Sequence, residues 1–205
     1  MPWSRVGEVL NMKFRAAVGS DLTPEDLRFL AGKAFRNYHI TDYDNLLLTI
    51  SQFCKDPLPD RNFTFWEWFY AIYKVTRDNL KDLWNKDNRV IYGFISRKQT
   101  EELLISRPNG TFLLRYSDSE PGCVTIAYVN ETKSRPAIFM IKPFNSRDLS
   151  IRSLADRIND LKHLTYLYPA IPKDQAFAKY YEPDNDTNPA PNGYIKPVLV
   201  TQVPG

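Results

Sequence analysis

The chain has 205 residues, of which 43% are hydrophobic and 14% aromatic, and its formal net charge is +3. This length and apolar content are enough to bury the core of one large domain or two small ones. The small net charge argues against nucleic-acid binding through overall charge. The longest apolar runs fall far short of the roughly 18 residues of a membrane span, and the amino terminus lacks a signal-peptide pattern. We therefore expect a cytosolic or nuclear protein without a membrane partner.

Residues 1–88 are predicted to form an all-helical domain. Thr23 and Thr64 each precede an apolar stripe at helical spacing, and Asp26 and Glu67 follow them by three residues. This is the spacing of a capping box, in which two residues satisfy each other's backbone N–H groups at the start of a helix. The aromatic segment FTFWEWFYAIY behind Thr64 is expected to lie in the core.

A further helix is predicted to begin at Thr41, with Asp44 as its capping partner. Its apolar positions would run from Leu46 to Cys54, and Pro57 and Pro59 would end it.

Residues 89–182 are predicted to form an α+β domain, in which a central antiparallel sheet is flanked by helices. Ser96 with Gln99 starts a helix, and the segments TFLLRYS, CVTIAYV and AIFMIK alternate as strands do. Ser153 with Asp156 starts a later helix, and PKDQAFAKY is expected to form a last short one. Residues 183–205 carry no apolar period over EPDNDTNPAPNG and are predicted to be a flexible tail.

The cysteines and histidines give no sign of a metal, a cofactor or a catalytic centre. Cys54 and Cys123 lie in separate segments, so we expect neither a disulfide nor a metal cluster and place both in the core. His39 and His163 have no carboxylate, cysteine or histidine at ligand spacing. We therefore predict that the protein is not an enzyme.

Arg115 is the residue that points most clearly to a function. It lies inside the apolar segment TFLLRYS, on the same strand face as Leu113 and Ser117. A buried guanidinium needs an anionic partner, and the neighbouring sequence offers no carboxylate on this face. A phosphate matches its donors, and Ser117 and Ser119 in the next loop add hydroxyls. Arg97, at the start of the preceding helix, is a second cation. The same residues also fit an internal ion pair followed by a simple turn.

The sequence resembles one known family along most of its length. GTFLLRYSDSE carries the signature of Src-homology-2 (SH2) domains, and IYGFISRKQTEELLISRPNGTFLLRYSDSEPGCVTIAYV is similar to the signal transducer and activator of transcription (STAT) branch. WSRVGEVLNMKF and NFTFWEWFYAIYKVTRDNLKDLWN resemble the linker domain of that family. KPFNSRDLSIRSLADRINDL, YLYPAIPKDQAFAKYY and NGYIKP resemble its carboxy-terminal half and phosphorylation site.

The resemblance assigns roles to individual residues. It implies that Arg115 is the phosphate-binding arginine, that Arg97 is the basic residue of the first SH2 helix, and that Ser117 and Ser119 are the hydroxyl residues of the phosphate loop. Two positions depart from the family pattern. Arg97 stands where lysine is usual, which changes its reach and hydrogen-bonding geometry. Tyr116 replaces a more usual phenylalanine, a change that costs little if its hydroxyl reaches solvent.

Tyr194 is the predicted phosphorylation site. It lies in the segment NGYIKP, and Ile195, Lys196 and Pro197 after it are expected to supply sequence preference. From the residues alone, a tyrosine in a flexible tail also fits no site-specific role. The resemblance favours phosphorylation, which would add the dianion that Arg115 is suited to bind.

The function implied by the resemblance is that of a phosphotyrosine-binding and dimerisation module in a signal transducer and transcription activator. A tyrosine kinase would modify Tyr194, and the modified tail would dock in the Arg115 pocket of a STAT-like partner to form a homo- or heterodimer. Phosphotyrosine peptides of activated receptors are further expected partners. DNA would be reached only through family domains outside this chain. The expected location is the cytoplasm, with movement to the nucleus on activation.

Other hypotheses stay open at this point. One is a regulatory fragment that occupies phosphotyrosine sites without activating transcription, and another is a phosphate-independent adaptor that uses the helical domain as its interaction surface. Direct nucleic-acid binding has little support because the basic residues are spread along the chain.

Overall fold

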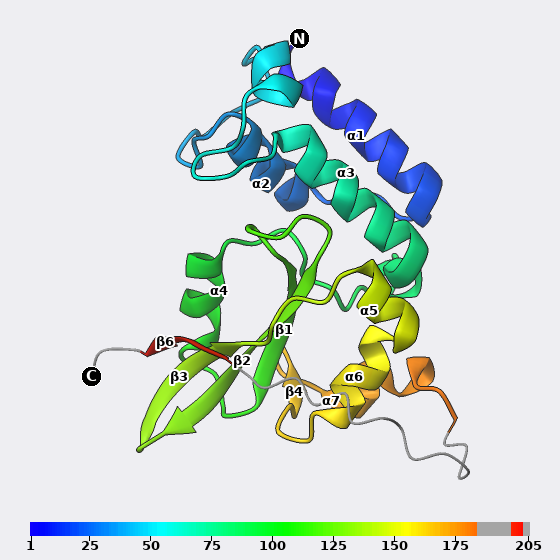
Figure 1. The fold of residues 1–205 in the computed structure, drawn as a ribbon, viewed down its shortest axis with the longest axis vertical. Coiled ribbons are helices and arrows are strands. Elements are labelled where there is room, and N and C mark those ends of the chain that lie inside the picture. Colours follow the sequence, from blue (N-terminus) through cyan, green and yellow to red (C-terminus); the bar gives the residue numbers. More distant parts are fainter. Residues whose placement is uncertain (184–197, 203–205) are drawn as a thin grey trace. The chain divides into compact units, whose positions relative to one another are not determined.

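The structure, a computed structural model, describes residues 1–183 and 198–202 (Figure 1). Its contacts divide the chain into two compact units. The first comprises Met1–Arg89 together with Tyr116–Cys123, and the second comprises the rest of the described chain. A short loop thus belongs with the helices although strands of the second unit precede and follow it. The predicted domain boundaries at residues 88 and 182 stay a prediction.

The first unit is built from helices, as the sequence predicted. They are α1 (Trp3–Val18), α2 (Pro24–Ala34), η1 (Ser51–Lys55), α3 (Phe65–Val75), η2 (Thr76–Leu80) and η3 (Lys81–Trp84). The capping boxes at Thr23 and Thr64 are both present at the starts of α2 and α3. Helix α1 ends at Gly19, whose φ of 86° is the left-handed conformation that glycine adopts at low cost.

Aromatic side chains fill the core of the first unit. Phe14 and Trp84 meet edge to face with 5.0 Å between their ring centroids, and Phe65 stacks on Phe69 at 6.3 Å. Trp68 is 1% exposed and anchors α3. Large rings at helical spacing bury much apolar area per residue, so short helices are enough to form the core of this unit.

The prediction of a helix that starts at Thr41 is wrong. Instead of forming a helix, the segment 41–49 makes backbone hydrogen bonds with the amino terminus. Leu46 accepts a backbone hydrogen bond from Trp3 and Leu48 donates one to Met1. The Thr49 hydroxyl accepts from the Gln52 N–H at 3.0 Å, and only the short η1 follows. Cys54 was expected in the core and is exposed, whereas Cys123 is buried.

The second unit combines one mixed sheet with helices. Its elements are α4 (Arg97–Leu104), β1 (Thr111–Tyr116), β2 (Val124–Thr132), β3 (Arg135–Met140), α5 (Ser146–Ile151), α6 (Leu154–Asp160), β4 (Tyr166–Leu167), β5 (Ile171–Pro172), α7 (Lys173–Phe177), η4 (Ala178–Tyr180) and β6 (Val198–Gln202). The last residue of β1, Tyr116, belongs by its contacts to the first unit.

The strand order is β5-β4-β1-β2-β3-β6. The α+β class is confirmed, but the sheet is not purely antiparallel, because β4 runs parallel to β1. The two-residue strands β4 and β5 are too short to show a periodic signal in the sequence. Strand β6 pairs with β3 inside the segment predicted to be a flexible tail, so that prediction missed the β-branched run VLV.

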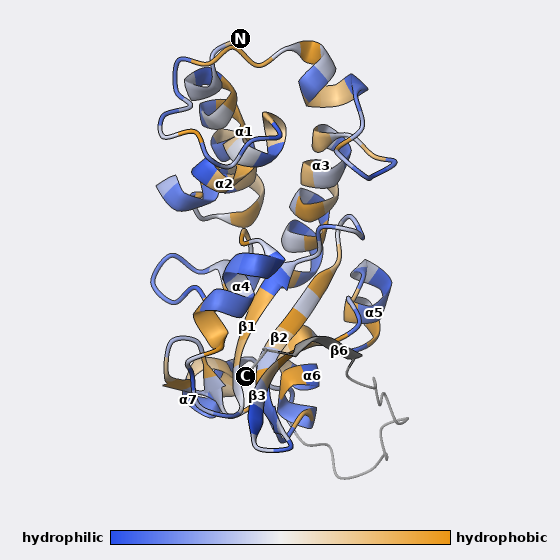
Figure 2. Cartoon of the chain, turned by 90° about the vertical axis from the view of Figure 1, so that its left-hand side faces the viewer, coloured by the Kyte–Doolittle hydropathy of each residue, from blue (hydrophilic) through white to orange (hydrophobic). Residues whose placement is uncertain are grey.

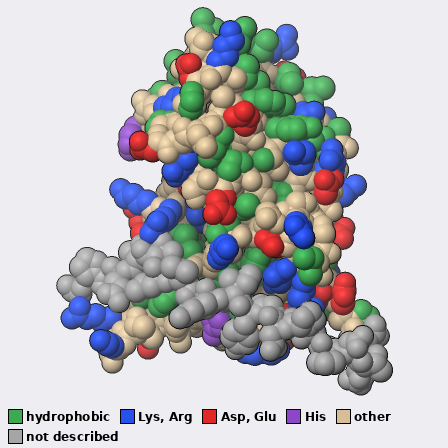
Figure 3. Space-filling view, in the orientation of Figure 1, with side chains coloured by type: hydrophobic (Ala, Val, Ile, Leu, Met, Phe, Trp, Pro, Cys, Tyr) green, Lys and Arg blue, Asp and Glu red, His purple; other side chains and the backbone are tan. Residues whose placement is uncertain are grey.

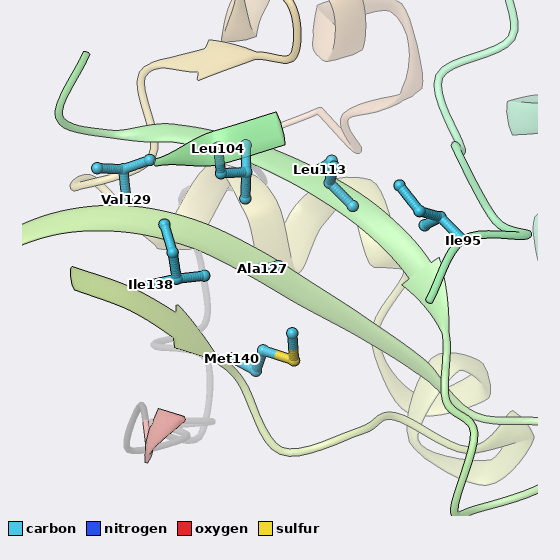
Figure 4. Packing of buried hydrophobic residues seen from close by; sticks show 7 residues of the cluster. All are labelled: Ile95, Leu104, Leu113, Ala127, Val129, Ile138 and Met140. Atoms are coloured by element: carbon cyan, nitrogen blue, oxygen red, sulfur yellow. The ribbon is translucent and has the colours of Figure 1, made fainter. Parts of the chain in front are cut away.

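Helix α4 covers one face of this sheet. Its Leu104 packs with Leu113 of β1, Ile138 of β3 and their neighbours Ile95, Ala127, Val129 and Met140. Figure 4 shows these side chains gathered over β1, β2 and β3, and Figure 2 shows both β1 and β2 coloured mostly hydrophobic. On the other face Phe112 stacks on Phe177 of α7 at 5.9 Å. Successive residues of β1 therefore face opposite layers, as a strand requires.

No helix among the described residues has both the length and the apolar character needed to cross a membrane.

Candidate functional site

Arg115 lies where the sequence placed it, inside β1 and on the face that Leu113 uses for the α4 core. Only 4% of its surface is exposed. Its Nε–H donates to the Ile95 carbonyl at 3.2 Å, and its Nη1 lies 3.8 Å from the sulfur of Met140. The guanidinium is thus oriented by backbone and by the edge of an aliphatic core, where the low dielectric strengthens its attraction for an anion.

The segment that leads into α4 holds Arg115 in this position. The Gly93 N–H donates to the Leu114 carbonyl at 2.9 Å, so residues 93–96 run beside the end of β1. Ser96 then caps α4 through a capping box with Gln99, as predicted. Because Ile95 is the acceptor for Arg115, the arginine lies beside the start of a helix, where unpaired N–H groups add positive potential.

Arg97 is the first residue of α4 and is exposed. Its Nε lies 3.4 Å from an oxygen of Glu101 one turn later. Exposed pairs of this kind contribute little to stability and constrain the side chain weakly.

Ser117 and Ser119 come together in the loop of the first unit. The Ser117 hydroxyl accepts the backbone N–H groups of Ser119 at 3.3 Å and Glu120 at 3.2 Å, and it lies 3.4 Å from the Ser119 hydroxyl. Ser117 is buried and Ser119 is exposed. The turn thus brings two hydroxyls and two backbone amides together, with both amides donating to the Ser117 oxygen. Hydroxyls and amides are the groups that compose anion-binding loops.

Other residues of the helical unit hold this loop, and no local pattern in the sequence points to them. The Trp68 Nε1–H donates to the Ser117 carbonyl at 3.1 Å, and the Arg61 Nε–H donates to the Asp118 carbonyl at 3.1 Å. Lys33 lies 3.1 Å from the carboxylate of Asp118. Trp68, Arg61 and Lys33 lie 49, 57 and 85 positions, respectively, before the loop residues that they contact.

The Tyr116 hydroxyl does not reach solvent, so the condition for a low-cost replacement of phenylalanine is not met. Tyr116 is 1% exposed, and its hydroxyl lies 2.5 Å from the hydroxyl of Thr76 and accepts the Trp84 Nε1–H at 2.8 Å. Burial raises the pKa of this phenol, although both hydrogen bonds act in the opposite direction. The hydroxyl therefore belongs to a buried polar network at the start of the loop.

The predicted phosphorylation site Tyr194 and its neighbours Ile195, Lys196 and Pro197 lie outside the described residues. The chain becomes described again at Val198, where β6 pairs antiparallel with β3.

The chemistry available at these residues is that of binding. Guanidinium groups, hydroxyls and backbone amides are hydrogen-bond donors for an anion. Within residues 1–183 and 198–202, no group of histidine, cysteine, aspartate and glutamate side chains is arranged to hold a metal ion.

Comparison with known proteins gives two family matches and a curated relative. Residues 1–69 match the family model of the "Signal transducer and activator of transcription, linker domain", and residues 91–168 match the SH2 domain. The "Signal transducer and transcription activator" of Anopheles gambiae is 45% identical over 185 residues. This match covers 89% of the chain but 25% of the relative, so the chain spans about a quarter of that relative's length. The matched families are signal transducers rather than enzymes.

Proposed function

The chain belongs to the signal transducer and activator of transcription family, and from this membership we propose that it recognises phosphotyrosine through Arg115, Arg97, Ser117 and Ser119. One observation carries the proposal. A buried arginine ends the apolar face of β1, and the turn that follows gathers hydroxyl and amide donors around Ser117. A phosphate dianion is a ligand for both groups of donors.

We also propose that Tyr194 supplies the ligand. A tyrosine kinase adds the phosphate, and the modified tail docks on a second copy or on another STAT-like chain. Two such dockings in one dimer strengthen each other through effective concentration. Phosphotyrosine peptides of activated receptors would use the same site before dimerisation.

The edge of β3 supports a role for the residues after Tyr194. Strand β6 pairs there from Val198 to Gln202, with Ala137 opposite Gln202 and Met140 opposite Val198. An extended peptide added to a sheet edge gains affinity from backbone hydrogen bonds and specificity from alternate side chains. In the dimer the same edge would receive the partner's segment, with Ile195, Lys196 and Pro197 setting sequence preference.

A titration tests phosphate recognition. The ligand is a peptide of residues 192–202, with and without phosphate on Tyr194, and heat of binding is measured for the wild type, Arg115→Ala and Arg147→Ala. Arg147 is an exposed arginine of the same unit and serves as the matched control. We expect the phosphopeptide alone to bind, Arg115→Ala to weaken it roughly hundredfold, and Arg147→Ala to leave it unchanged. Equal affinity for both peptides would remove the proposed function.

Sedimentation of the phosphorylated chain tests the dimer. Wild type phosphorylated at Tyr194 should sediment as a dimer, and Tyr194→Phe and Arg115→Ala should both sediment as monomers. If the phosphorylated wild type sediments as a monomer, the proposal of reciprocal docking is excluded, whereas the proposal of phosphopeptide recognition still stands. The full signalling role, with movement from cytoplasm to nucleus and DNA contact through other domains, would follow from the dimer.

A phosphate-independent adaptor is the second candidate, because the helical unit displays large apolar side chains. Met12 of α1, Leu47 and Ile50 are 54%, 69% and 70% exposed. Figure 3 shows hydrophobic side chains on the surface of this part of the chain. Apolar side chains of this kind are typical of protein interaction sites. Partner capture that survives Arg115→Ala but is lost with Met12→Lys would favour the adaptor.

A further inference from the structure

The loop proposed to receive a phosphate carries an acidic residue in its middle. Asp118 lies between the two serines, and its side chain is 29% exposed. A carboxylate next to a dianion opposes binding, because like charges in a partly buried site repel strongly. The loop can therefore bind phosphate well only if the charge of Asp118 is offset.

Lys33 of α2 is placed to offset it. Its Nζ lies 3.1 Å from Oδ1 of Asp118, and its side chain is only 8% exposed. The same ammonium lies 4.2 Å from the centre of the Trp68 ring, which favours a cation at that position. Lysine is almost never buried to this extent unless it is paired.

Two other residues also hold the backbone of the loop. Trp68 donates to the Ser117 carbonyl and Arg61 donates to the Asp118 carbonyl, so the backbone on both sides of the carboxylate is held by other residues. Neither of these two hydrogen bonds is made by the ammonium. What Lys33 supplies at Asp118 is a positive charge.

We propose that Lys33 is a positioning residue for phosphotyrosine recognition, which neutralises Asp118 and so keeps the Ser117–Ser119 turn receptive to a dianion. This inference rests on the proposed function. It makes a residue of the matched linker segment, 85 positions before Asp118, a determinant of affinity for phosphate.

A double-mutant cycle tests the inference on the full chain, with the phosphopeptide of residues 192–202 as ligand. We expect Lys33→Met to weaken binding about ten- to hundredfold, because Asp118 is left uncompensated. Asp118→Asn should bind at least as well as the wild type. The double variant Lys33→Met/Asp118→Asn should return to within about threefold of the wild type, because the repelling charge is gone.

Two controls separate charge from folding. Lys33→Arg keeps the charge and should bind within a few-fold of the wild type. Lys13→Met removes a lysine that lies 4.8 Å from the Tyr73 ring in the same unit and should not change affinity. All titrations are made well below the thermal midpoint of each variant, and Lys33→Gln replaces Lys33→Met if the latter does not fold.

The outcomes are distinct from those for the proposed function. If the wild type does not discriminate the phosphopeptide, the proposed function fails and the inference fails with it. If the wild type discriminates and Arg115→Ala abolishes binding, but Lys33→Met binds as the wild type does, only the inference fails. It also fails if the double variant stays as weak as Lys33→Met, because Lys33 would then act through structure rather than charge.

Discussion

Strand β1 and the loop that follows it are continuous in sequence, yet different parts of the molecule hold them. Arg115 is oriented from the second unit, by the Ile95 carbonyl at the start of α4. Ser117, two positions later, accepts a hydrogen bond from Trp68 within the helical unit. The cation is thus held by the unit that contains the β-sheet, and the backbone of the loop is held by the aromatic core of the helical unit.

This difference separates two kinds of information in the sequence. The arginine inside an apolar strand is a local signal, and it predicts a phosphate site within a few residues. The shape of the loop depends on Trp68, Arg61 and Lys33, which no local pattern connects to it. The comparison therefore predicts that changes in the helical unit can alter the loop, whereas changes in the sheet act on Arg115 and its surroundings.

The largest effect is expected from Trp68→Ala. The substitution removes a ring that is 1% exposed and the donor to the Ser117 carbonyl, so the free energy of unfolding should fall by about 3–5 kcal/mol. Denaturant unfolding measures this loss. Trp68→Phe is the matched variant, because it keeps most of the ring area but loses the N–H donor. It should lower the free energy of unfolding much less than Trp68→Ala does, and it should still weaken phosphopeptide binding. Equal binding by Trp68→Phe and the wild type would show that the loop does not need this contact.

Gly110→Ala is the corresponding change in the second unit. Gly110 has a φ of +85°, and an added Cβ would overlap the Thr165 hydroxyl and lie 2.8 Å from the His163 carbonyl. The strained backbone and the overlap should together cost about 3 kcal/mol in denaturant unfolding. Gly19→Ala is the control, because it has a similar φ of +86° with no atom within 4 Å of the added Cβ. It should cost only the backbone strain, and equal losses at both positions would contradict the account.

Tyr116→Phe should have a smaller effect, confined to the network at the start of the loop. The substitution removes the phenol oxygen that the Thr76 hydroxyl and the Trp84 Nε1–H contact, so the free energy of unfolding should fall by about 1–3 kcal/mol. Thermal unfolding measures the loss. An unchanged midpoint would mean that the two groups find other partners.

The smallest expected effect is a pH dependence from His163 in the second unit. Burial, with a lesser contribution from the charge of Lys173, lowers the pKa of this imidazole below its ordinary 6.5. The unfolded chain therefore takes up the proton more readily, so the stabilising contribution is present above about pH 6.5 and is lost as pH falls below it. The difference in unfolding free energy between the wild type and His163→Gln should change slightly over this range. A difference that is the same on both sides of pH 6.5 would contradict the prediction.

Much of the fold was predictable because its signals are local. The capping boxes at Thr23, Thr64 and Ser96 each start the helix that the sequence predicted. The same spacing at Asn145 and Asp148 starts α5, a helix that is absent from the sequence predictions. The spacing of Thr41 and Asp44 also predicted a helix, but this segment forms backbone hydrogen bonds with Met1 and Trp3 instead.

The candidate site was predictable where it depends on local patterns, and not where it depends on residues distant in the sequence. The position of Arg115 on the α4 face of β1 and the pairing of the Ser117 and Ser119 hydroxyls follow from strand period and turn chemistry. The burial of the Tyr116 hydroxyl depends on Thr76 and Trp84, which lie 40 and 32 positions away. The roles of these residues in phosphate binding remain predictions.

Hydrogen exchange of the wild type, with the phosphorylated and then the unphosphorylated peptide of residues 192–202, tests the central claim most directly. The claim is that the end of β1 and the loop both take part in recognising one phosphate. The account predicts that only the phosphopeptide slows exchange, both at residues 93–97 beside Arg115 and at the amides of Ser119 and Glu120. Binding of the phosphopeptide with unchanged exchange at Ser119 and Glu120 would contradict it, because the loop would then have no part in recognition.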